Sequence, residues 1–410
     1  QKGDLIILAA RPSVGKTAFA SINLIMPFIM GLTALGFMMG TGGSAIVAKT
    51  LGEGKPEKAN EYFSLIVYTT IIGGLILSIL GMFLVRPVSI LLGAEGELLE
   101  NCVLYGRITF ISLTAFMLQN VFQSFFVTAT KPKLGLAVIV SAGVTNMVLD
   151  YLFIAVLGFG LAGAAIATVC GELIGGLFPI FYFSRENPSL LKLGRTKFNG
   201  SILLKTCTNG SSELMTNLSS SVVNSLYNIQ LLKFTGEDGV AAVSIIMYLQ
   251  FLCIGIYFGF SMGLSTPLGY AYGDRNFSVC RVLEKYAYRF FAIAPIILYG
   301  CTYLLTPIGV RFFASPGSTV FDMAVSGMRL YGLGFLFSGI NIFAAIRMMT
   351  YGKGYISGII TFLRSFALLL LFLTVLPRFL DLNGIWLAVP AAEILTLIVA
   401  LWTLRKKTVV

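Results

Sequence analysis

Long apolar segments recur along almost the whole chain, and they restrict the possible folds more than any other feature. A helix needs about 20 apolar residues to cross a bilayer, and from residue 21 onward the sequence predicts eleven such helices. They cover roughly residues 21–48, 62–85, 100–128, 134–157, 161–184, 209–233, 240–270, 286–306, 323–349, 355–377 and 384–404. Several exceed the usual span, which is compatible with tilt or with extension beyond the membrane.

The composition agrees with this pattern. The chain is 57% hydrophobic and only 11% charged, whereas soluble proteins carry about 25% charged residues. It contains no histidine, so a proton relay would have to use carboxylates, and its six cysteines show no metal-binding spacing. The sequence therefore predicts an all-α membrane protein that is not an enzyme and has no cofactor.

The net charge of +11 reflects membrane topology. Basic residues gather in alternate connections, and by the positive-inside rule those connections are cytoplasmic. The cytoplasmic set comprises the residues around Lys55, Lys131, Lys192, Arg281 and Lys353, together with the C-terminal Arg405, Lys406 and Lys407. We therefore expect a cytoplasmic C-terminus, a multi-pass membrane protein in contact with lipid, and no nucleic-acid partner.

An internal repeat divides the chain. At an offset of 221 residues, GTGGSAIVAKTLGEGK (40–55) matches SMGLSTPLGYAYGDRN (261–276), and LAGAAIATVCGE (161–172) matches LNGIWLAVPAAE (382–393). We therefore predict two homologous transmembrane helix bundles, residues 21–198 and residues 199–410. Such repeats are typical of secondary transporters, whose substrate path lies between the repeats.

The same offset indicates a gap at the start of the chain. The helix at 209–233 opens the second repeat, and its partner in the first would lie at about −12 to 12. The expected plan therefore has twelve helices, of which the first is missing or replaced.

Residues 1–20 differ from the rest of the chain. The stretch ARPSVGKT (10–17) follows an apolar strand-like run and has the pattern of a phosphate-binding loop, in which Lys16 would contact phosphates and Thr17 a magnesium ion. GDLIILAARPS resembles the nucleotide-binding stretch of DnaB-type replicative helicases. Nothing downstream supplies the remaining parts of such a domain, so we interpret 1–20 as a fused leader without a working nucleotide site.

Asp150 is the first candidate for an ion or proton site. It lies in an apolar segment four residues after Asn146, so both occupy one face of a helix. A carboxylate inside a membrane helix usually faces a bundle interior or a water-filled path. The alternative is an aspartate at the outer interface that caps the turn before GFG (158–160).

Glu213 is the second candidate. Together with Asn217, Ser220, Asn224 and Asn228 it forms a polar stripe along an apolar helix. The stripe predicts the lining of an aqueous substrate path, and interhelical hydrogen bonding is the alternative.

For the other polar residues within the apolar helices, the sequence supports a functional role less strongly. Glu172 and Glu393 occupy equivalent places in the repeat, which favours a shared structural role. Gln119 and Gln123 are candidates for the lining of the path. Arg107, Arg329 and Arg364 could neutralise acids or lie near an interface.

The chain resembles the multidrug and toxic compound extrusion (MATE) family, most closely its MepA-like branch. The resemblance covers residues 21–410 and is carried by GGSAIVAKTLGEGKPEKA (42–59), NMVLDYLFI (146–154), GLAGAAIATVCGE (160–172), LGYAYGDRN (268–276) and GIWLAVPAAE (384–393). It implies a two-lobed bundle in the cell inner membrane that exports drugs or organic cations in exchange for Na⁺ or H⁺. Asn146 and Asp150 match the family's fifth-helix pattern, and Glu213 matches its seventh-helix acid.

The predicted function is therefore a monomeric secondary antiporter for drugs or organic cations. Three alternatives stay open at this point: a truncated fusion that does not transport, a lipid-precursor flippase of related architecture, and a nucleotide-dependent enzyme built on residues 1–20.

Overall fold

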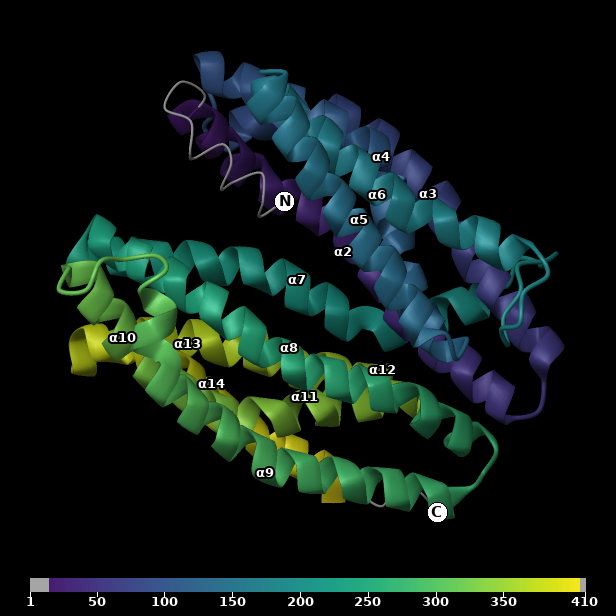
Figure 1. Ribbon diagram of the computed structural model, residues 1–410. Coiled ribbons are helices and arrows are strands. Elements are labelled where there is room, and N and C mark those ends of the chain that lie inside the picture. The colour runs from purple at the N-terminus through teal and green to yellow at the C-terminus, as the bar shows by residue number, and fades with distance from the viewer. Residues whose placement is uncertain (1–14, 406–410) are drawn as a thin grey trace. The chain divides into compact units, whose positions relative to one another are not determined.

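The computed structural model describes the backbone of residues 15–405, without the side chains of 15–20, 23, 221, 225, 228, 232, 237, 240 and 405. Every secondary-structure element in this range is helical, as Figure 1 shows. Ten helical spans among the described residues are long and apolar enough to cross a membrane. The prediction of an all-α membrane protein is therefore confirmed.

The chain folds as two compact units, which we call the N-terminal unit and the C-terminal unit. The first comprises Gln1–Leu51 and Lys55–Gly210, and the second comprises Gly52–Gly54 and Ser211–Val410. Each is described by itself. The predicted domain boundary at 198/199 stays a prediction, and helix α7 (Gly200–Thr235) runs through the position where the two units meet in sequence.

The N-terminal unit is built from five helical spans. They are α2 (Gly15–Gly52), α3 (Pro56–Leu91), α4 (Gly96–Thr128), α5 (Pro132–Asp150) continued by the π-helix η1 (Tyr151–Val156), and α6 (Gly160–Ser184). Helix α4 packs against both α3 and α6, and α5 packs against α6.

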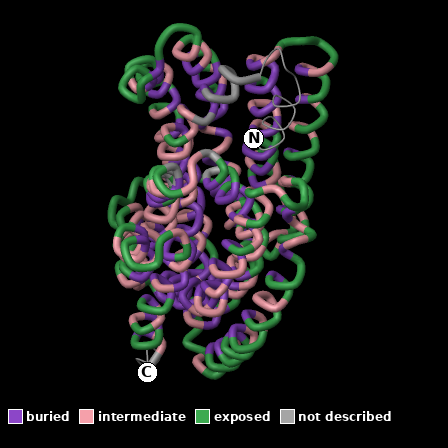
Figure 2. The backbone as a smooth tube through the Cα atoms, turned by 90° about the vertical axis from the view of Figure 1, so that its left-hand side faces the viewer, coloured by how far each residue is buried: buried purple, intermediate pink, exposed green. Residues whose placement is uncertain are grey.

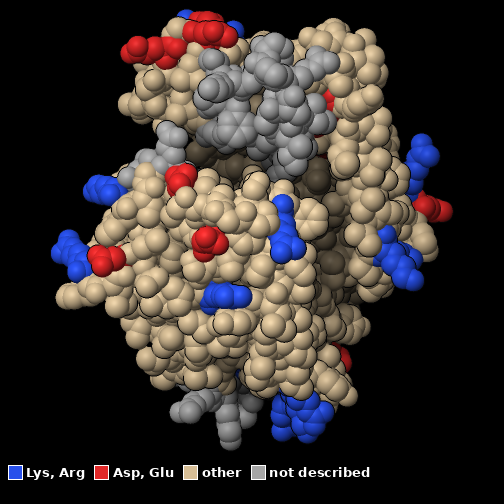
Figure 3. All heavy atoms as spheres, turned by 60° about the vertical axis from the view of Figure 1, so that its left-hand side comes forward, with Lys and Arg blue, Asp and Glu red and all other residues tan. Residues whose placement is uncertain are grey.

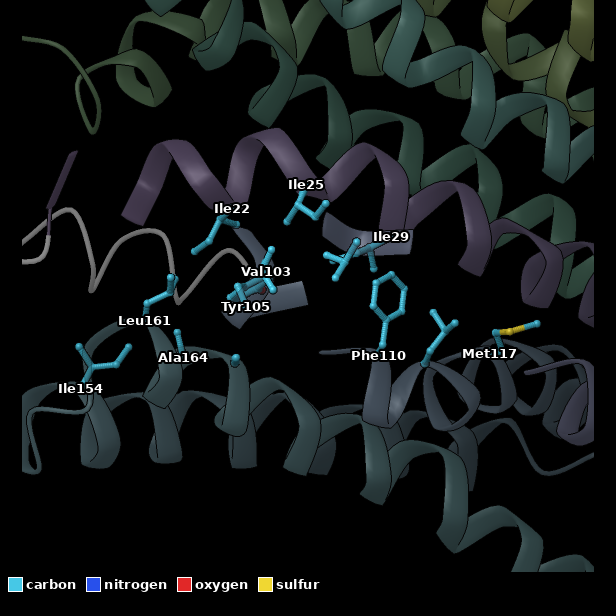
Figure 4. Packing of buried hydrophobic residues seen from close by; sticks show 13 residues of the cluster. Ile22, Ile25, Ile29, Val103, Tyr105, Phe110, Met117, Ile154, Leu161 and Ala164 are labelled. Carbon is cyan, nitrogen blue, oxygen red and sulfur yellow. The ribbon is translucent and has the colours of Figure 1, made fainter. Parts of the chain in front are cut away.

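Two apolar clusters hold this unit together. In the first, shown in Figure 4, side chains of α2 such as Ile22 and Ile29 face Val103 and Phe110 of α4. In the second, Phe63 of α3 contacts Phe125 of α4, with ring centroids 4.8 Å apart. Burial of such side chains contributes roughly 1.5–3 kcal/mol each.

Close helix contact in this unit depends on a glycine. A Cβ added at Gly176 of α6 would lie 2.3 Å from the carbonyl oxygen of Ala115 on α4. No real Cβ approaches a backbone oxygen so closely, so only glycine allows these two helices their present separation.

The stretch between α6 and α7 is irregular but well bonded. The backbone N–H of Lys192 donates to Asn60 Oδ1 at 2.8 Å, and that of Gly194 donates to Ser64 Oγ at 3.0 Å. The basic connection is therefore fixed to the first turns of α3.

The C-terminal unit contains the rest of α7 and the helices that follow. They are α8 (Glu237–Gly273), α9 (Phe277–Val310), α10 (Thr319–Tyr331), the 3₁₀ turn η2 (Gly332–Gly334), α11 (Phe335–Thr350), α12 (Gly354–Phe362), the π-helix η3 (Leu363–Ala367), α13 (Leu368–Val375) and α14 (Pro377–Arg405). Helix α11 packs against α8, α9, α12 and α14 and is the centre of the unit.

Positive-φ residues at three turns relate the two units. Gly54 corresponds to Arg275, Thr130 to Gly352, and Gly160 to Asp381. The offset is 221 residues at the first and third turns and 222 at the second. The repeat is thus visible in the backbone, with a one-residue change of register between α4/α5 and α11/α12.

The surface has the character expected for contact with lipid. Ile72, Ile76, Ile79 and Phe83 recur along one face of α3, and Phe83 is 75% exposed. Exposed residues, green in Figure 2, follow the outer sides of the helices. On the face drawn in Figure 3 uncharged residues, in tan, cover most of the surface. Apolar exposure on this scale is unusual for a soluble protein.

Several helices extend further than predicted. Helix α3 begins at Pro56 rather than 62, and α9 begins at Phe277 rather than 286. Charged residues such as Glu57 and Lys58 in α3, and Arg281 in α9, occupy these added turns. Charged residues therefore mark the end of the apolar part of each helix and not the end of the helix itself.

Candidate functional site: buried acids and a polar cavity

Asp150 is fully buried, with 0% of its surface exposed. It is the last residue of α5 and directly precedes the π-helix η1. A single π-helical turn is frequent at functional sites because it changes the direction of the side chains around it. An aspartate at an outer membrane interface would have been partly exposed, so this burial favours the interior placement.

Asn146 lies one turn before Asp150 and is half-buried. Its Cβ lies 3.2 Å from the position that a Cβ on Gly171 of α6 would take, so Asn146 stands at the contact of α5 with α6. Its amide nitrogen Nδ2 has no hydrogen-bond partner among the described residues. This nitrogen is available as a hydrogen-bond donor to a ligand or to water.

Glu172 of α6 is also buried and accepts a hydrogen bond at 2.6 Å from Ser112 Oγ of α4. This bond joins the two helices, as a structural acid would. Gln119 stands at the same contact, because a Cβ on Gly175 would approach its side chain. Gln123 is exposed. The two glutamines therefore do not share an environment.

Glu213 and Asn217 of α7 are half-buried, and Asn217 Nδ2 donates to the main-chain oxygen of Glu213 at 2.8 Å. Neither residue lines the cavity described below, whereas Ser220 and Asn224 both do. The first part of the polar stripe, Glu213 and Asn217, therefore lies away from the cavity. At this level of α7 the cavity is lined by Thr216 instead.

A cavity of about 290 Å³ lies inside the C-terminal unit. Its walls come from α7, α8, the segment around η2, η3 with α13, and α14. Aromatic rings form much of the lining, among them Tyr227, Phe251, Tyr331 and Phe335. A concave, mainly apolar space with a few polar groups is the usual form of a small-molecule site.

A buried ion pair faces this cavity. Arg364 of η3 donates from Nη2 to Oε1 of Glu393 on α14 at 2.6 Å, and from Nε to the same oxygen at 3.1 Å. Asn341 of α11 donates to the other carboxylate oxygen, Oε2, at 2.7 Å. The side chains of Arg364 and Glu393 are only 11% and 5% exposed.

The repeat-related acids therefore have different partners, because Glu172 accepts a bond from a neutral serine and Glu393 from an arginine. Of the other helix arginines, Arg329 lies over the ring of Tyr303 at 4.5 Å, and Arg107 is exposed. Only Arg364 among these three is seen to neutralise an acid.

Most of the cavity-lining residues were not singled out from the sequence, among them Tyr227, Gln250 and Ser338. Gln250 is the one amide side chain in the run YLQFLCIG. An amide within such an apolar run could have identified Gln250 as a candidate for the lining of a polar cavity. Tyr227 and Ser338 gave none, since both residue types are common in membrane helices.

Lys16 and Thr17 lie in the first turn of α2, but their side chains, and the residues 1–14 before them, fall outside the described residues. The nucleotide-binding resemblance of that stretch therefore stays a prediction.

The sequence is similar to those of two multidrug export proteins. A multidrug export protein MepA of Staphylococcus saprophyticus is 24% identical over 326 residues, which is 78% of this chain and 72% of the relative. The MepA of Staphylococcus haemolyticus is 24% identical over 331 residues, with the same coverage.

Solved structures share the fold. A MATE in complex with MaL6 superimposes with a TM-score of 0.92 at 22% identity, covering 98% of this chain and 90% of that one. An outward-facing multidrug resistance MATE family transporter gives a TM-score of 0.90 at 23% identity, with the same coverage.

The MatE family model matches residues 5–152 and 214–375, which together make up most of the sequence. Its two segments fall on the two homologous bundles that the repeat and the turns define. The chain therefore belongs to the MatE family, whose members are membrane transporters and not enzymes.

Proposed function

We propose that the protein is a secondary active antiporter that exports drugs or organic cations across the cell inner membrane in exchange for Na⁺ or H⁺. It would act as a monomer surrounded by lipid, without a cofactor and with a cytoplasmic C-terminus. The names of the similar proteins, which are multidrug exporters, support the substrate class.

The observation that carries the proposal is the complete burial of Asp150 inside a bundle of membrane helices. A carboxylate in such surroundings is costly when charged, so its occupancy by H⁺ or Na⁺ strongly affects the energy of the state that buries it. Asn146, one turn away, offers an amide oxygen as a further ligand for a cation.

Coupling requires that the ion and the substrate favour different conformations of the transporter. In the proposed cycle Asp150 and Glu213 take up the coupling ion, while Ser220 and Asn224 contribute to the path of the substrate. Only a difference in ion affinity between the two conformations can drive export, because a ligand that binds both equally shifts nothing.

The test is transport by purified protein in proteoliposomes under separate Na⁺ and H⁺ gradients. Asp150→Asn should abolish gradient-driven accumulation of a cationic dye, because the amide cannot exchange a proton and holds Na⁺ weakly. Asp322→Asn serves as the matched control, since Asp322 is exposed on α10.

Two results would refute the proposal. One is an Asp150→Asn variant that accumulates the dye as well as the parent does, with the same response to both gradients. The other is a parent protein that moves no dye under either gradient. Lipid-linked substrates tested in the same vesicles would then distinguish a flippase from a chain that does not transport.

Topology has its own test. A protease-cleavable tag placed after residue 410 should be cut by added protease in inside-out membrane vesicles, in which the cytoplasmic side faces the medium. The same tag should stay intact when protease is added to whole cells. Cleavage in whole cells would overturn the predicted orientation.

A further inference from the structure

A groove of about 530 Å³ lies on the surface of the N-terminal unit, where α3 packs against α4. Its lining comprises Ile79, Met82 and Phe83 of α3 and Arg107, Ile108 and Ile111 of α4. Three of the apolar side chains, those of Ile79, Phe83 and Ile111, are 56%, 75% and 61% exposed. The groove therefore belongs to the lipid-facing surface, and Arg107 is the one charged group in its lining.

Arg107 lacks a partner within the described part of the chain. It is exposed, and it makes no ion pair or hydrogen bond with any residue that the structure describes. Glu100, seven residues before it on α4, is already paired with Arg86 of α3, whose Nη2 lies 2.9 Å from Glu100 Oε1. A guanidinium stays charged at any physiological pH, and a charge on a lipid-facing surface is costly unless it is paired. Arg107 therefore requires an anion from outside the chain.

The level of Arg107 along the helices is that of lipid headgroups. Residues 62–85 of α3 carry no charge and span about 36 Å at 1.5 Å per residue, slightly more than the roughly 30 Å of a hydrocarbon core. Arg86 ends this stretch, and Met82, which lines the groove together with Arg107, lies one turn inside it. The guanidinium is therefore close to the boundary of the hydrocarbon. From there the groove continues along Ile79 and Ile111 toward the middle of the two helices.

The internal repeat allows a comparison with the same position in the other unit. The offset is 221 residues for α3 and α9, and 222 for α4 and the segment formed by α10 and η2. With these offsets Gly81 beside Phe110 corresponds to Thr302 beside Gly332, and both pairs lie in contact. The correspondence therefore holds at the level of the groove.

Arg107 then corresponds to Arg329, and Met82 corresponds to Tyr303. The guanidinium carbon of Arg329 lies 4.5 Å from the centroid of the Tyr303 ring, which is a cation–π contact. A methionine offers no such ring, so the guanidinium of Arg107 faces the groove instead. The same arginine of the repeat thus has an aromatic partner in one unit and an open groove in the other.

We propose that this groove is a binding site for one anionic phospholipid, whose phosphate pairs with Arg107 and whose acyl chain lies between α3 and α4. A guanidinium and a phosphate form paired, charge-assisted hydrogen bonds, and Ile79, Ile108 and Ile111 pack along the chain. The lining holds one cation and no acid, so the choline of a zwitterionic lipid would add a second cation beside Arg107. The site goes beyond the proposed function, because it requires neither an ion gradient nor a drug.

A lipid titration tests the charge preference. Phosphatidylglycerol or phosphatidylcholine with identical acyl chains is added to the purified, delipidated full-length chain in a neutral detergent, and native mass spectrometry resolves each bound lipid. The first phosphatidylglycerol should bind roughly tenfold more tightly than the first phosphatidylcholine. Phosphatidylglycerol should also raise the unfolding temperature more than phosphatidylcholine does, because a ligand of the folded state stabilises it according to its affinity.

Four variants separate the charge from the apolar groove. Arg107→Gln should lower the affinity for phosphatidylglycerol to that for phosphatidylcholine, whereas Arg107→Lys keeps the charge and should retain most of the preference. Ile111→Trp fills the groove and should weaken both lipids. Arg311→Gln removes an exposed arginine outside the groove and should change neither affinity.

The proposal is overturned if the parent binds both lipids equally, a result that needs no variant to fold. It is also overturned if Arg107→Gln elutes as a monodisperse peak and keeps the parent's preference. A parent that is dimeric, with Arg107→Gln monomeric, would refute it as well, because the anion would then be an acid of a second copy. Since binding is measured without a gradient, a loss of this site leaves the proposed antiport standing, and a failure of antiport leaves this site standing.

Discussion

Arg347 of α11 donates a hydrogen bond from Nε to Oε1 of Glu284 on α9 at 2.5 Å, inside the C-terminal unit. Tyr351 donates to the same carboxylate oxygen at 2.6 Å. Applying the repeat offsets that hold at the neighbouring turns, 221 for α9 and 222 for α11, the corresponding residues of the N-terminal unit are Phe63 and Phe125. Those two rings pack directly on one another. One place in the repeat is thus filled by an ion pair in one unit and by two aromatic rings in the other.

This correspondence predicts the response to mutation. Glu284→Gln or Arg347→Met should each destabilise the protein by about 3–5 kcal/mol, because each leaves one buried charge unpaired. The double variant Glu284→Phe/Arg347→Phe, which copies the other unit, should be less damaging than either single change. Thermal unfolding in one detergent measures all three. A double variant less stable than both singles would show that the two places are not equivalent.

The bond between Ser112 and Glu172 predicts a loss of stability without a loss of coupling. Ser112→Ala removes a buried hydrogen bond to an acid and should cost about 1.5–3 kcal/mol. Ser326→Ala is the matched control, since this exposed serine bonds only within its own helix. If Glu172 is the structural acid that the repeat suggests, the ratio of drug moved to ions moved in proteoliposomes should stay at its parental value. A changed ratio would place Glu172 in the ion path instead.

The close approach of α4 and α6 at Gly176 predicts a steric effect. Gly176→Ala forces a methyl group against the Ala115 carbonyl, and overpacking of this kind typically costs about 1–3 kcal/mol. Gly143→Ala on α5 is the control, because a Cβ there meets nothing within 4 Å; it should be neutral or stabilise by up to about 1 kcal/mol. Equal unfolding temperatures for Gly176→Ala and Gly143→Ala would contradict this explanation.

Asn341 predicts a pH-dependent stability in a suitable variant. In Asn341→Asp a second carboxylate faces Glu393, and the single charge of Arg364 cannot neutralise both. The folded variant should therefore bind one more proton than its unfolded chain does, so its stability should fall as the pH rises. Unfolding temperatures between pH 5 and pH 8 should show this slope for Asn341→Asp and none for Asn341→Leu. Parallel curves for the two variants would mean that the second carboxylate is solvated elsewhere.

The sequence was sufficient to predict the helical fold, because membrane helices reveal themselves by long apolar runs alone. Their ends were less predictable. Charged turns such as Glu57–Lys58 belong to helices, and the predicted 323–349 helix is divided by η2, in which Gly332 and Gly334 are buried.

Individual side chains were predicted less well than helices, because their partners lie far away in sequence. Arg364 was one of three arginines with no evident acid, and its bond to Glu393 spans 29 residues of chain between two helices. Spacing placed Glu213, Asn217, Ser220 and Asn224 on one face, yet a helix face is wide, and only Ser220 and Asn224 reach the cavity. The roles of these residues, and those of Asp150 and Asn146, stay predictions until transport is measured.

The exchange of rings for ions between Phe63 and Phe125 on one side and Glu284 and Arg347 on the other has a consequence for chimeras of the two units. A charge that takes the place of one ring without its partner of opposite sign is buried alone, which costs about 3–5 kcal/mol. A single helix moved from the C-terminal unit into the N-terminal unit would therefore bring half of an ion pair, whereas α9 and α11 moved together would bring the complete pair.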